Sequence, residues 1–418
     1  MRTALRAIEN AATPTGSERP KRRSLGEGRP SHKKLKLNSG GNNNNKKKKR
    51  VEIDYATFIE QLDAATTLAS AGGSSSSEED SYERGGYHRV AVGDVFKRRY
   101  RVVSKLGWGT YSTVWRCWDQ VADAPVALKI QRAESSFAAA AINEVVMLER
   151  VAEAAPNAPV VKLLDHFFFA GPNGNHVCLV LECLDETLLV ACKRRNGLPI
   201  HQVKAITRAL LDALRILHDD LGVVHGDLKP ENLMLRAGSG PVGDRLRLVD
   251  FGLAFFADRQ RGVDIQTREY RCPEGLLGIH DYSPAADIWS VGCLVFELVT
   301  GVFLFSVPSP KKYDGYAKDE AHLAQAVELL GPIPFSLASR RGAKAARWFS
   351  AGTATLNNVA PRIPTPGVDA MAHVLEDELG FPKTEAQGIS TFLRPFLQFE
   401  PSRRITARDA LKSDWLKL

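Results

Sequence analysis

The sequence lacks the marks of a secreted or membrane protein. Its six cysteines form no C-x-x-C pair, and no apolar signal segment begins the chain. We therefore expect reduced thiols in a protein of the cytoplasm and nucleus. The longest apolar run, residues 288–305, contains Glu297, so it predicts a buried helix and no membrane association.

Most of the chain carries no net charge. Residues 1–99 hold 20 Lys and Arg against 12 Asp and Glu, which accounts for the whole formal charge of +8. Runs of Asn at 42–45, of basic residues at 46–50 and of Ser at 74–77 mark residues 1–85 as a basic, low-complexity tail. Such a segment buries too little apolar surface to offset its ordering entropy, so we expect disorder there.

Aromatic residues are lacking from the first part of the tail, since residues 1–50 contain no Phe, Tyr or Trp. Base stacking is therefore not supported, and outside the basic tail we expect no direct nucleic-acid binding. The basic runs at 21–23 and 46–50 fit a nuclear-import signal or nonspecific RNA contacts. A solvated extension without either role explains them equally well.

After residue 85 the pattern changes to short strands followed by helices. Strand-like segments are expected at residues 102–106, 113–118, 126–130 and 177–181. Helical segments are expected at 138–151, 202–218, 285–300, 322–330, 390–399 and 407–411. This order predicts an α+β protein with a small β-rich lobe at 86–184 and a larger helical lobe at 185–418.

A glycine-rich loop follows the first expected strand. It consists of Leu106, Gly107, Trp108, Gly109, Thr110, Tyr111, Ser112, Thr113 and Val114. The string fits the pattern G-x-G-x-x-G-x-V, with Ser112 in place of the third glycine, and such loops let the backbone approach phosphates. Taken alone, the string is a weak signal, and an ordinary turn would be the favoured interpretation.

A lysine at the end of a buried strand is the second motif. Lys129 closes the sequence Val-Ala-Leu-Lys at 126–129, and a buried ammonium needs an anionic partner. Glu144 on the following helix is the natural one, in which case Lys129 would hold the α- and β-phosphates of ATP. A surface salt bridge remains the alternative.

The strongest signal is His-Gly-Asp-Leu-Lys-Pro-Glu-Asn at 225–232, followed by Asp-Phe-Gly at 250–252. Asp227 can accept the proton of a substrate hydroxyl, and Lys229 can neutralise the moving phosphoryl group. Asn232 and Asp250 are expected to bind Mg²⁺. The spacing predicts a β-hairpin between the two aspartates, with residues 238–243 as its turn.

Five elements stand in the order that ATP-dependent phosphoryl transfer requires: glycine loop, lysine, helix glutamate, catalytic loop and Asp-Phe-Gly. Two further pairings are expected to be structural. Glu274 should pair with Arg404, and Asp287 should support the catalytic loop from a buried helix.

With these motifs in place, the chain resembles the SR-protein kinases, which phosphorylate Arg-Ser-rich splicing factors. The matching stretches are residues 85–88, 92–94, 106–109, 112–115, 265–268, 270–271, 286–290, 319–322 and 328–331. The resemblance runs from about residue 85 to 418. It implies a two-lobed Ser/Thr kinase that uses ATP and Mg²⁺, acts on Arg-Ser-rich proteins and works as a monomer.

The resemblance also implies an adenine site. Backbone groups of Glu182 and Leu184 would contact adenine, Leu181 would be the gatekeeper, and apolar walls would come from Leu106, Val114 and Ala127. Two departures from the family are visible: no long spacer separates the lobes, and Ala321 stands at an often acidic position of the docking stretch.

Basic substrates call for carboxylates near the active site. Candidates are Glu231, Asp314, Asp319, Glu320 and Glu328, although charged helix residues are more often solvated faces.

Regulation by phosphorylation of the activation loop, which follows Asp-Phe-Gly, is not expected. The position that often carries an arginine before the catalytic aspartate is Gly226, and residues 253–266 contain no Ser, Thr or Tyr. Neither phosphate acceptor nor phosphate receiver is present, so we expect activity without this modification.

Three other readings stay open. The first is another kinase of the cyclin-dependent or LAMMER-like group, against which Trp108 and residues 265–268 argue. The second is a pseudokinase scaffold for splicing factors, which would need Lys129, Asp227 or Asp250 to be missing. The third is an RNA-binding protein that acts through its tail.

Overall fold

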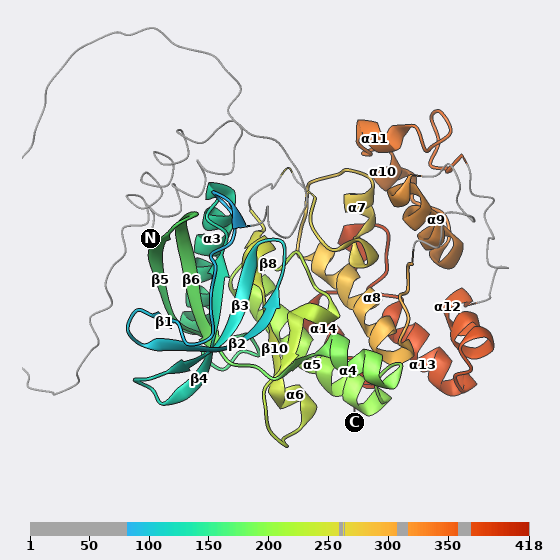
Figure 1. Cartoon of the computed structure of the whole chain (residues 1–418). Coiled ribbons are helices and arrows are strands. Elements are labelled where there is room, and N and C mark those ends of the chain that lie inside the picture. The colour runs from blue at the N-terminus through green and yellow to red at the C-terminus, as the bar shows by residue number, and fades with distance from the viewer. Residues whose placement is uncertain (1–81, 259–261, 263, 307–316, 358–368, 418) are drawn as a thin grey trace, which may run out of the picture. The chain divides into compact units, whose positions relative to one another are not determined.

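The computed structural model describes residues 82–258, 262, 264–306, 317–357 and 369–417. Of the expected tail, all but residues 82–85 lies outside the described part. The described elements belong to one compact unit, residues 75–418 (Figure 1).

The first lobe is an antiparallel sheet covered by one long helix, α3 Ser135–Ala154 (Figure 1). The strands lie in the order β1-β2-β3-β4-β6-β5. Their bounds are β1 Val95–Phe96, β2 Tyr100–Trp108, β3 Ser112–Asp119, β4 Ala124–Gln131, β5 Leu163–Gly171 and β6 Gly174–Glu182. Strand β4 is buried along almost its whole length, because one of its faces packs in the sheet's core with Tyr100 and Val102.

Two small sheets follow the first lobe. Their strands are β7 Glu186–Thr187, β8 Val223–Val224, β9 Leu233–Leu235, β10 Leu246–Leu248 and β11 Phe255–Phe256. Strands β9 and β10 pair antiparallel, so the predicted hairpin between Asp227 and Asp250 is confirmed. Its connection was expected to be a plain turn, but it contains a short helix, α6 Val242–Arg245.

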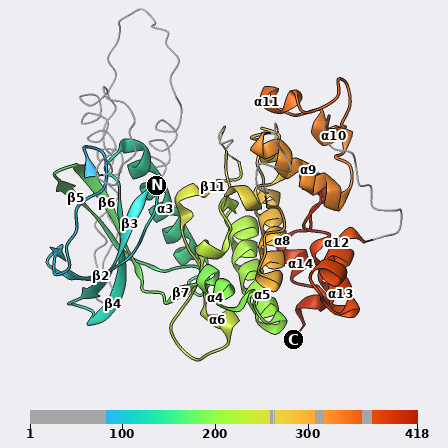
Figure 2. The same ribbon diagram turned by 45° about the vertical axis from the view of Figure 1, so that its right-hand side comes forward.

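The second lobe is helical. Its helices are α4 Leu188–Arg195, α5 Ile200–Arg215, α7 Pro273–Leu276, α8 Ala285–Thr300, α9 Lys318–Leu330, α10 Phe335–Ala338, α11 Ala343–Ala346, α12 Ala370–His373, α13 Lys383–Leu393 and α14 Ala407–Ala410. Helices α5 and α8 run side by side through its centre (Figure 2). All residues of α8 after the first are buried, as its apolar sequence requires.

The expected α+β, two-lobed fold is confirmed, with one error in the helices. A helix was predicted at 390–399, but α13 ends at Leu393. Pro395 is incompatible with a continuing helix, and the apolar residues after it pack without helical geometry. Among the described helices, none has both the length and the apolar character needed to cross a bilayer.

Candidate active site

Two carboxylates from different parts of the chain contact Lys129 of β4. Its Nζ lies 2.9 and 2.7 Å from the two carboxylate oxygens of Glu144 on α3. It also lies 2.8 Å from Oδ1 of Asp250. The predicted pairing of Lys129 with Glu144 is therefore formed, and it is buried rather than on the surface. We call Lys129, Glu144 and Asp250 the lysine cluster.

The charges of the lysine cluster support one another. Burial alone would lower the pKa of Lys129, but the carboxylates of Asp250 and Glu144 raise it above its ordinary value. Burial alone would raise the pKa of Asp250, but the Lys129 ammonium lowers it to about 2. Both groups therefore stay ionised near neutral pH.

Asp250 is held in a left-handed backbone conformation, with φ of 63°. Non-glycine residues seldom adopt this region, and they persist there only when their surroundings enforce it. The next residue provides such an anchor, because Phe251 is fully buried against the ring of His225 and its amide donates to Glu144 at 3.3 Å. The side chain of Asp250 itself is 42% exposed, so its carboxylate stays accessible.

Asp227 lies at the centre of a second network. Its Oδ1 accepts hydrogen bonds from the amide and the hydroxyl of Thr267, at 3.0 and 2.8 Å. Its Oδ2 accepts from Lys229 Nζ at 2.8 Å and from Asn232 Nδ2 at 3.2 Å. The predicted catalytic residues Asp227 and Lys229 are thus in direct contact, and four donors fix the carboxylate.

The position of this network depends on Asp287 of α8. Its carboxylate is fully buried and accepts from the amides of His225 and Gly226, at 2.8 and 2.9 Å. The expected support of the catalytic loop by Asp287 is therefore confirmed. The expected pair of Glu274 and Arg404 is also formed, with two contacts of 2.7 and 2.6 Å.

Asn232 and Asp250 were predicted to bind metal. The amide nitrogen of Asn232 is committed to Asp227, which leaves its amide oxygen as the atom for a cation. Among the described residues no group of three or more His, Cys, Asp or Glu could hold a metal alone. Mg²⁺ is commonly bound by one or two protein oxygens together with substrate phosphates, so this pair fits a metal that arrives with ATP.

The glycine loop lies between β2 and β3, where the chain turns at Gly109 and Ser112. Val114, at the end of the loop, pairs with Lys129 across β3 and β4, so the loop ends beside the lysine cluster. On the other side of β4, Ala127 pairs with Leu181 of β6. The predicted apolar wall and gatekeeper are thus neighbours in the sheet.

Glu182, the last residue of β6, begins the connection between the lobes. Its amide donates to the carbonyl of Lys162, so only its carbonyl remains for an adenine contact. Its carboxylate accepts from Arg236 at 2.6 Å. Leu184 follows in the same connection.

The segment after Asp-Phe-Gly is anchored by the neutral side chain of Gln266 and by Arg271, which donates to the carbonyls of Ile265 and Gln266 at 3.1 and 3.0 Å. Gln266 donates to the carbonyl of Ala286 and to the hydroxyl of Ser290, both at 2.8 Å, and accepts from the amide of Cys272 at 3.0 Å. Its own amide donates to the carbonyl of Gly226. The backbone at Gly226 has φ of 76°, and an added Cβ would lie 3.1 Å from the Leu253 carbonyl oxygen.

Carboxylates gather where this segment meets α8. Glu297 is buried and accepts a hydrogen bond of 2.5 Å from the Tyr270 hydroxyl. Burial raises the pKa of Glu297 to about 7; the Tyr270 hydrogen bond and the Lys193 ammonium oppose this rise, and the nearby Glu231 and Glu269 carboxylates add to it. We call Glu231, Glu269 and Glu297 the acidic cluster.

Other acidic residues expected to face a basic substrate are placed differently. Asp319 and Glu320 are buried at the start of α9, and Asp319 is paired with Arg268 and with Lys344. Asp314 lies outside the described residues. Of the residues named from the sequence, Glu231 is exposed and Glu328 is partly exposed.

Three residues of this site had no assigned role in the sequence. Thr267 and Gln266 belong to a stretch noted only for its resemblance, although a polar pair directly before Arg268 could have suggested hydrogen bonding. Glu297 was noted only as a charge in an apolar run. A buried carboxylate in such a run is itself a signal, because it needs a partner.

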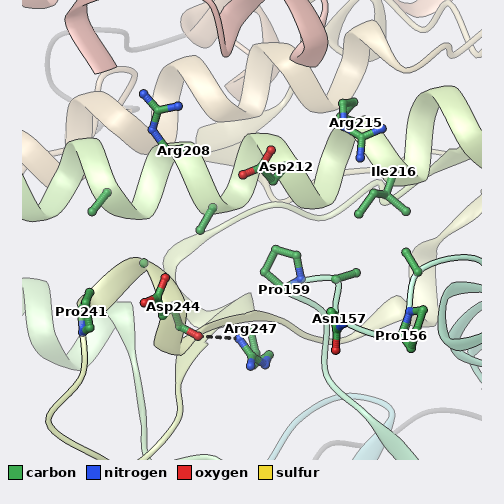
Figure 3. A pocket seen from close by; sticks show the side chains of 15 residues that line it. Pro156, Asn157, Pro159, Arg208, Asp212, Arg215, Ile216, Pro241, Asp244 and Arg247 are labelled. Carbon is green, nitrogen blue, oxygen red and sulfur yellow. Dashed lines mark hydrogen bonds between the residues drawn. The ribbon is translucent and has the colours of Figure 1, made fainter. Parts of the chain in front are cut away.

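A cavity of about 720 Å³ lies away from these residues (Figure 3). It is lined by α5, by the segment before β5 and by the connection that contains α6. Arg208, Asp212, Arg215, Asp244 and Arg247 face it, together with prolines and alanines. None of the predicted site residues lines it, so it is separate from the lysine cluster and from Asp227.

Comparisons with known proteins agree with this geometry. The family model for the protein kinase domain matches residues 100–416. The chain is 37% identical over 393 residues to "Serine/threonine-protein kinase SRPK" of Physarum polycephalum, covering 81% of this chain and 90% of that protein.

Two further relatives align over a similar share of the chain. "SRSF protein kinase 3" of Homo sapiens is 27% identical over 517 residues, which cover 80% of this chain and 89% of that protein. "Protein kinase dsk1" of Schizosaccharomyces pombe is 28% identical over 468 residues, which cover 81% and 84%.

Proposed function

The chain belongs to the protein kinase family and, within it, to the SR-protein kinases; from this premise we propose that it transfers the γ-phosphate of ATP, with Mg²⁺, to serines of Arg-Ser-rich proteins. It is a Ser/Thr protein kinase that uses ATP and a divalent metal ion. The observation that carries the proposal is the Asp227 carboxylate, fixed by four donors including Lys229 and Asn232.

The reaction needs a base, a cation and an oriented nucleotide. The substrate hydroxyl oxygen forms a bond to the γ-phosphorus, the bond from this phosphorus to the bridging oxygen breaks, and ADP leaves. Asp227 accepts the hydroxyl proton. Lys229, now bonded to Asp227, can turn to the γ-phosphate and free Oδ2 for the hydroxyl.

The nucleotide is held by the lysine cluster and the glycine loop. Lys129 donates to the α- and β-phosphates while Glu144 keeps its ammonium in place. Asp250 and the amide oxygen of Asn232 would hold Mg²⁺, which supplies charge neutralisation at the phosphate oxygens. Because Asp250 is ionised down to about pH 2, it is available to the metal at any physiological pH.

Preference for Arg-Ser-rich substrates is supported by the acidic cluster. Three carboxylates lie close together, with Lys193 as the weaker opposing charge at Glu297. A guanidinium from a substrate would find both charge and hydrogen-bond acceptors there. The names of two relatives, SRPK and SRSF protein kinase 3, refer to SR-protein substrates. We carry this specificity to the chain.

Activity without loop phosphorylation is supported by Gly226 and Gln266. Gly226 offers no side chain for a phosphate, and the neutral bonds of Gln266 already hold the segment against α8. We also propose that the enzyme is a monomer shared between cytoplasm and nucleus, with the basic runs at 21–23 and 46–50 as import signals. Loss of nuclear protein on deletion of residues 1–50 would support import.

The decisive experiment compares two peptides with Mg²⁺ and ATP, an Arg-Ser repeat and a Ser-Pro peptide, with wild type and Asp227→Ala. We expect transfer to the Arg-Ser peptide, weak transfer to the Ser-Pro peptide, and none from the variant. Equal or reversed preference would reject the substrate class. Phosphate transfer that survives in Asp227→Ala would reject the mechanism.

A further inference from the structure

We propose that the segment directly before the kinase domain holds the glycine loop in its working position, and that Tyr87 is a positioning residue for ATP. We call residues 82–88 the N-terminal strap. The match to the protein kinase domain begins at residue 100, so the strap precedes that domain. The inference rests on the proposed use of ATP.

The strap is fastened to the first lobe by backbone and side-chain hydrogen bonds. The amide of Gly85 donates to the carbonyl of Asn173 at 2.8 Å. The Asn173 side chain donates in turn to the carbonyl of Tyr87 at 2.6 Å. The amide of Glu134, just before α3, donates to the carbonyl of Gly85 at 2.9 Å. The strap is therefore fixed to the β5–β6 turn and to the start of α3.

Tyr87 reaches from this fixed segment to the glycine loop. Its side chain is buried, and its hydroxyl donates to the carbonyl of Gly109 at 2.6 Å. In a trans peptide the carbonyl and the following amide point in opposite directions, so this bond turns the Thr110 amide away from the strap. Loop amides are the donors that phosphate oxygens use, and Tyr87 thus sets the orientation of one of them.

Arg132 connects the same contact to α3. Its guanidinium lies over the rings of both Tyr87 and Phe137, at 5.2 and 4.9 Å, and donates to the carbonyl of Thr110 at 3.5 Å. Phe137 is in the first turn of α3, the helix that carries Glu144. The strap, the loop and the helix of the lysine cluster are therefore held as one assembly.

Other contacts hold the two sides of the loop: the amide of Arg132 donates to the carbonyl of Tyr111 at 3.0 Å, and Trp108 pairs with Thr113 across β2 and β3. Leu106, Trp108 and Tyr111 are 47%, 64% and 44% exposed, and Gly109 brings the backbone freedom of glycine. Loss of the Tyr87 hydroxyl would release the loop into a wider set of conformations. Nucleotide binding would then have to select the productive one, which lowers the apparent affinity.

The test is Tyr87→Phe in the full chain, with nucleotide affinity measured by titration of the fluorescent analogue mant-ATP with Mg²⁺. The variant keeps the ring beside Arg132 and removes only the hydroxyl. We expect Kd for mant-ATP and KM for ATP to rise about two- to tenfold, the worth of one hydrogen bond. We expect kcat at saturating ATP to change less than KM.

Tyr100→Phe is the matched control. Tyr100 is a buried tyrosine of the same lobe whose hydroxyl donates to Asp165 at 2.7 Å, far from the loop in the sheet. We expect it to lower the melting temperature and to leave nucleotide affinity unchanged. Asn173→Ala, which loosens the strap with Tyr87 intact, should raise Kd in the same direction as Tyr87→Phe.

Three results would overturn the proposal: unchanged affinity in Tyr87→Phe, an equal loss in Tyr100→Phe, or wild-type protein that fails to bind mant-ATP. Wild type that binds mant-ATP but phosphorylates no protein would instead reject the proposed function, and the comparison of the three variants would still decide the role of the strap.

Discussion

The lysine cluster and the acidic cluster both contain a buried glutamate, but the groups that surround its carboxylate differ. In the lysine cluster the ammonium of Lys129 faces two carboxylates at hydrogen-bond distance. In the acidic cluster Glu297 has a tyrosine hydroxyl as its bonded partner and two further carboxylates nearby. The first site has its cation at hydrogen-bond distance, whereas in the second the Lys193 ammonium has a smaller effect on Glu297 than the two neighbouring carboxylates.

This difference separates two tasks of one enzyme. A buried ion pair that is fully hydrogen-bonded keeps its geometry in the free protein, which suits the grip on a nucleotide that every substrate shares. Like charges held close together raise the free energy of the empty site, and an arriving cation relieves it. Under the proposed function, the acidic cluster favours one class of protein substrate, while the lysine cluster serves every substrate alike.

Breaking the lysine cluster should have the largest effect. Lys129→Met leaves two carboxylates facing each other without a cation, and it removes the phosphate contact. We expect kcat/KM to fall by about 10³-fold or more and the free energy of unfolding to fall by about 3 kcal/mol. Steady-state kinetics and urea denaturation measure the two.

The matched control for that change is Lys162→Met, the same substitution at an exposed lysine. It should leave both quantities close to wild type. Wild-type activity in Lys129→Met would show that the grip on the phosphates lies elsewhere.

Neutralising the acidic cluster should have a smaller and more selective effect. In the double variant Glu231→Gln, Glu297→Gln, we expect kcat/KM for an Arg-Ser peptide to fall about 10- to 100-fold, since charge-assisted hydrogen bonds are worth about 1.5–3 kcal/mol. Activity on a peptide without arginine should change little. Glu378→Gln, at an exposed glutamate of the same lobe, is the control, and equal losses on both peptides would contradict selectivity.

A pH profile sharpens the comparison further. The pKa of Glu297 is raised from 4.5 to about 7, so its charge, and with it the attraction for arginine, appears as pH rises from 6 to 8. We expect kcat/KM for the Arg-Ser peptide, relative to an arginine-free peptide, to rise about three- to tenfold over this range. Glu297→Gln should give a flat ratio, and a wild-type ratio that falls with pH would refute the assignment.

The raised pKa of Glu297 also determines in which direction stability changes with pH. Between about pH 4.5 and 7 the unfolded chain has lost the Glu297 proton while the folded chain still holds it, so this group lowers stability as pH rises. Denaturant unfolding should therefore show wild type losing stability relative to Glu297→Gln over this window. A difference that is constant with pH would show that Glu297 titrates normally.

The smallest expected effect concerns the segment after Asp-Phe-Gly, residues 253–266, which belongs to neither cluster. Because Gln266 anchors it through neutral hydrogen bonds, phosphatase treatment of the purified enzyme should change kcat by less than about twofold. Phosphatase-treated enzyme that is inert, and that recovers activity after treatment with another kinase, would refute this.

The sequence predicts this site well wherever a motif carries its own geometry. The spacing from Asp227 to Asn232, and the hairpin to Asp250, are set by local turns, so the grouping of Asp227 with Lys229 and Asn232 could be anticipated, although the bonds from Thr267 could not. Lys129 and Glu144 were paired because a buried ammonium has few alternatives. The roles of all these residues in catalysis stay predictions until the kinetics above are measured.

What could not be predicted depends on packing between distant segments. The apolar residues 396–399 continue the pattern of α13 beyond Pro395, so the helix was placed too late in the chain. Nothing local to Asp319 indicates that Arg268 and Lys344 occupy its carboxylate. The contact of Tyr87 with Gly109 joins residues whose relation only the folded sheet creates.

The backbone at Gly226 has a consequence for how this enzyme could ever be controlled. Its positive φ is strained for any L side chain, and a Cβ there would lie 3.1 Å from the Leu253 carbonyl oxygen, so the backbone would have to shift to admit an arginine. Residues 253–266 contain no Ser, Thr or Tyr to accept a phosphate. Under the proposed function, dependence on an upstream kinase through this loop would therefore require a new receiver and a new acceptor together.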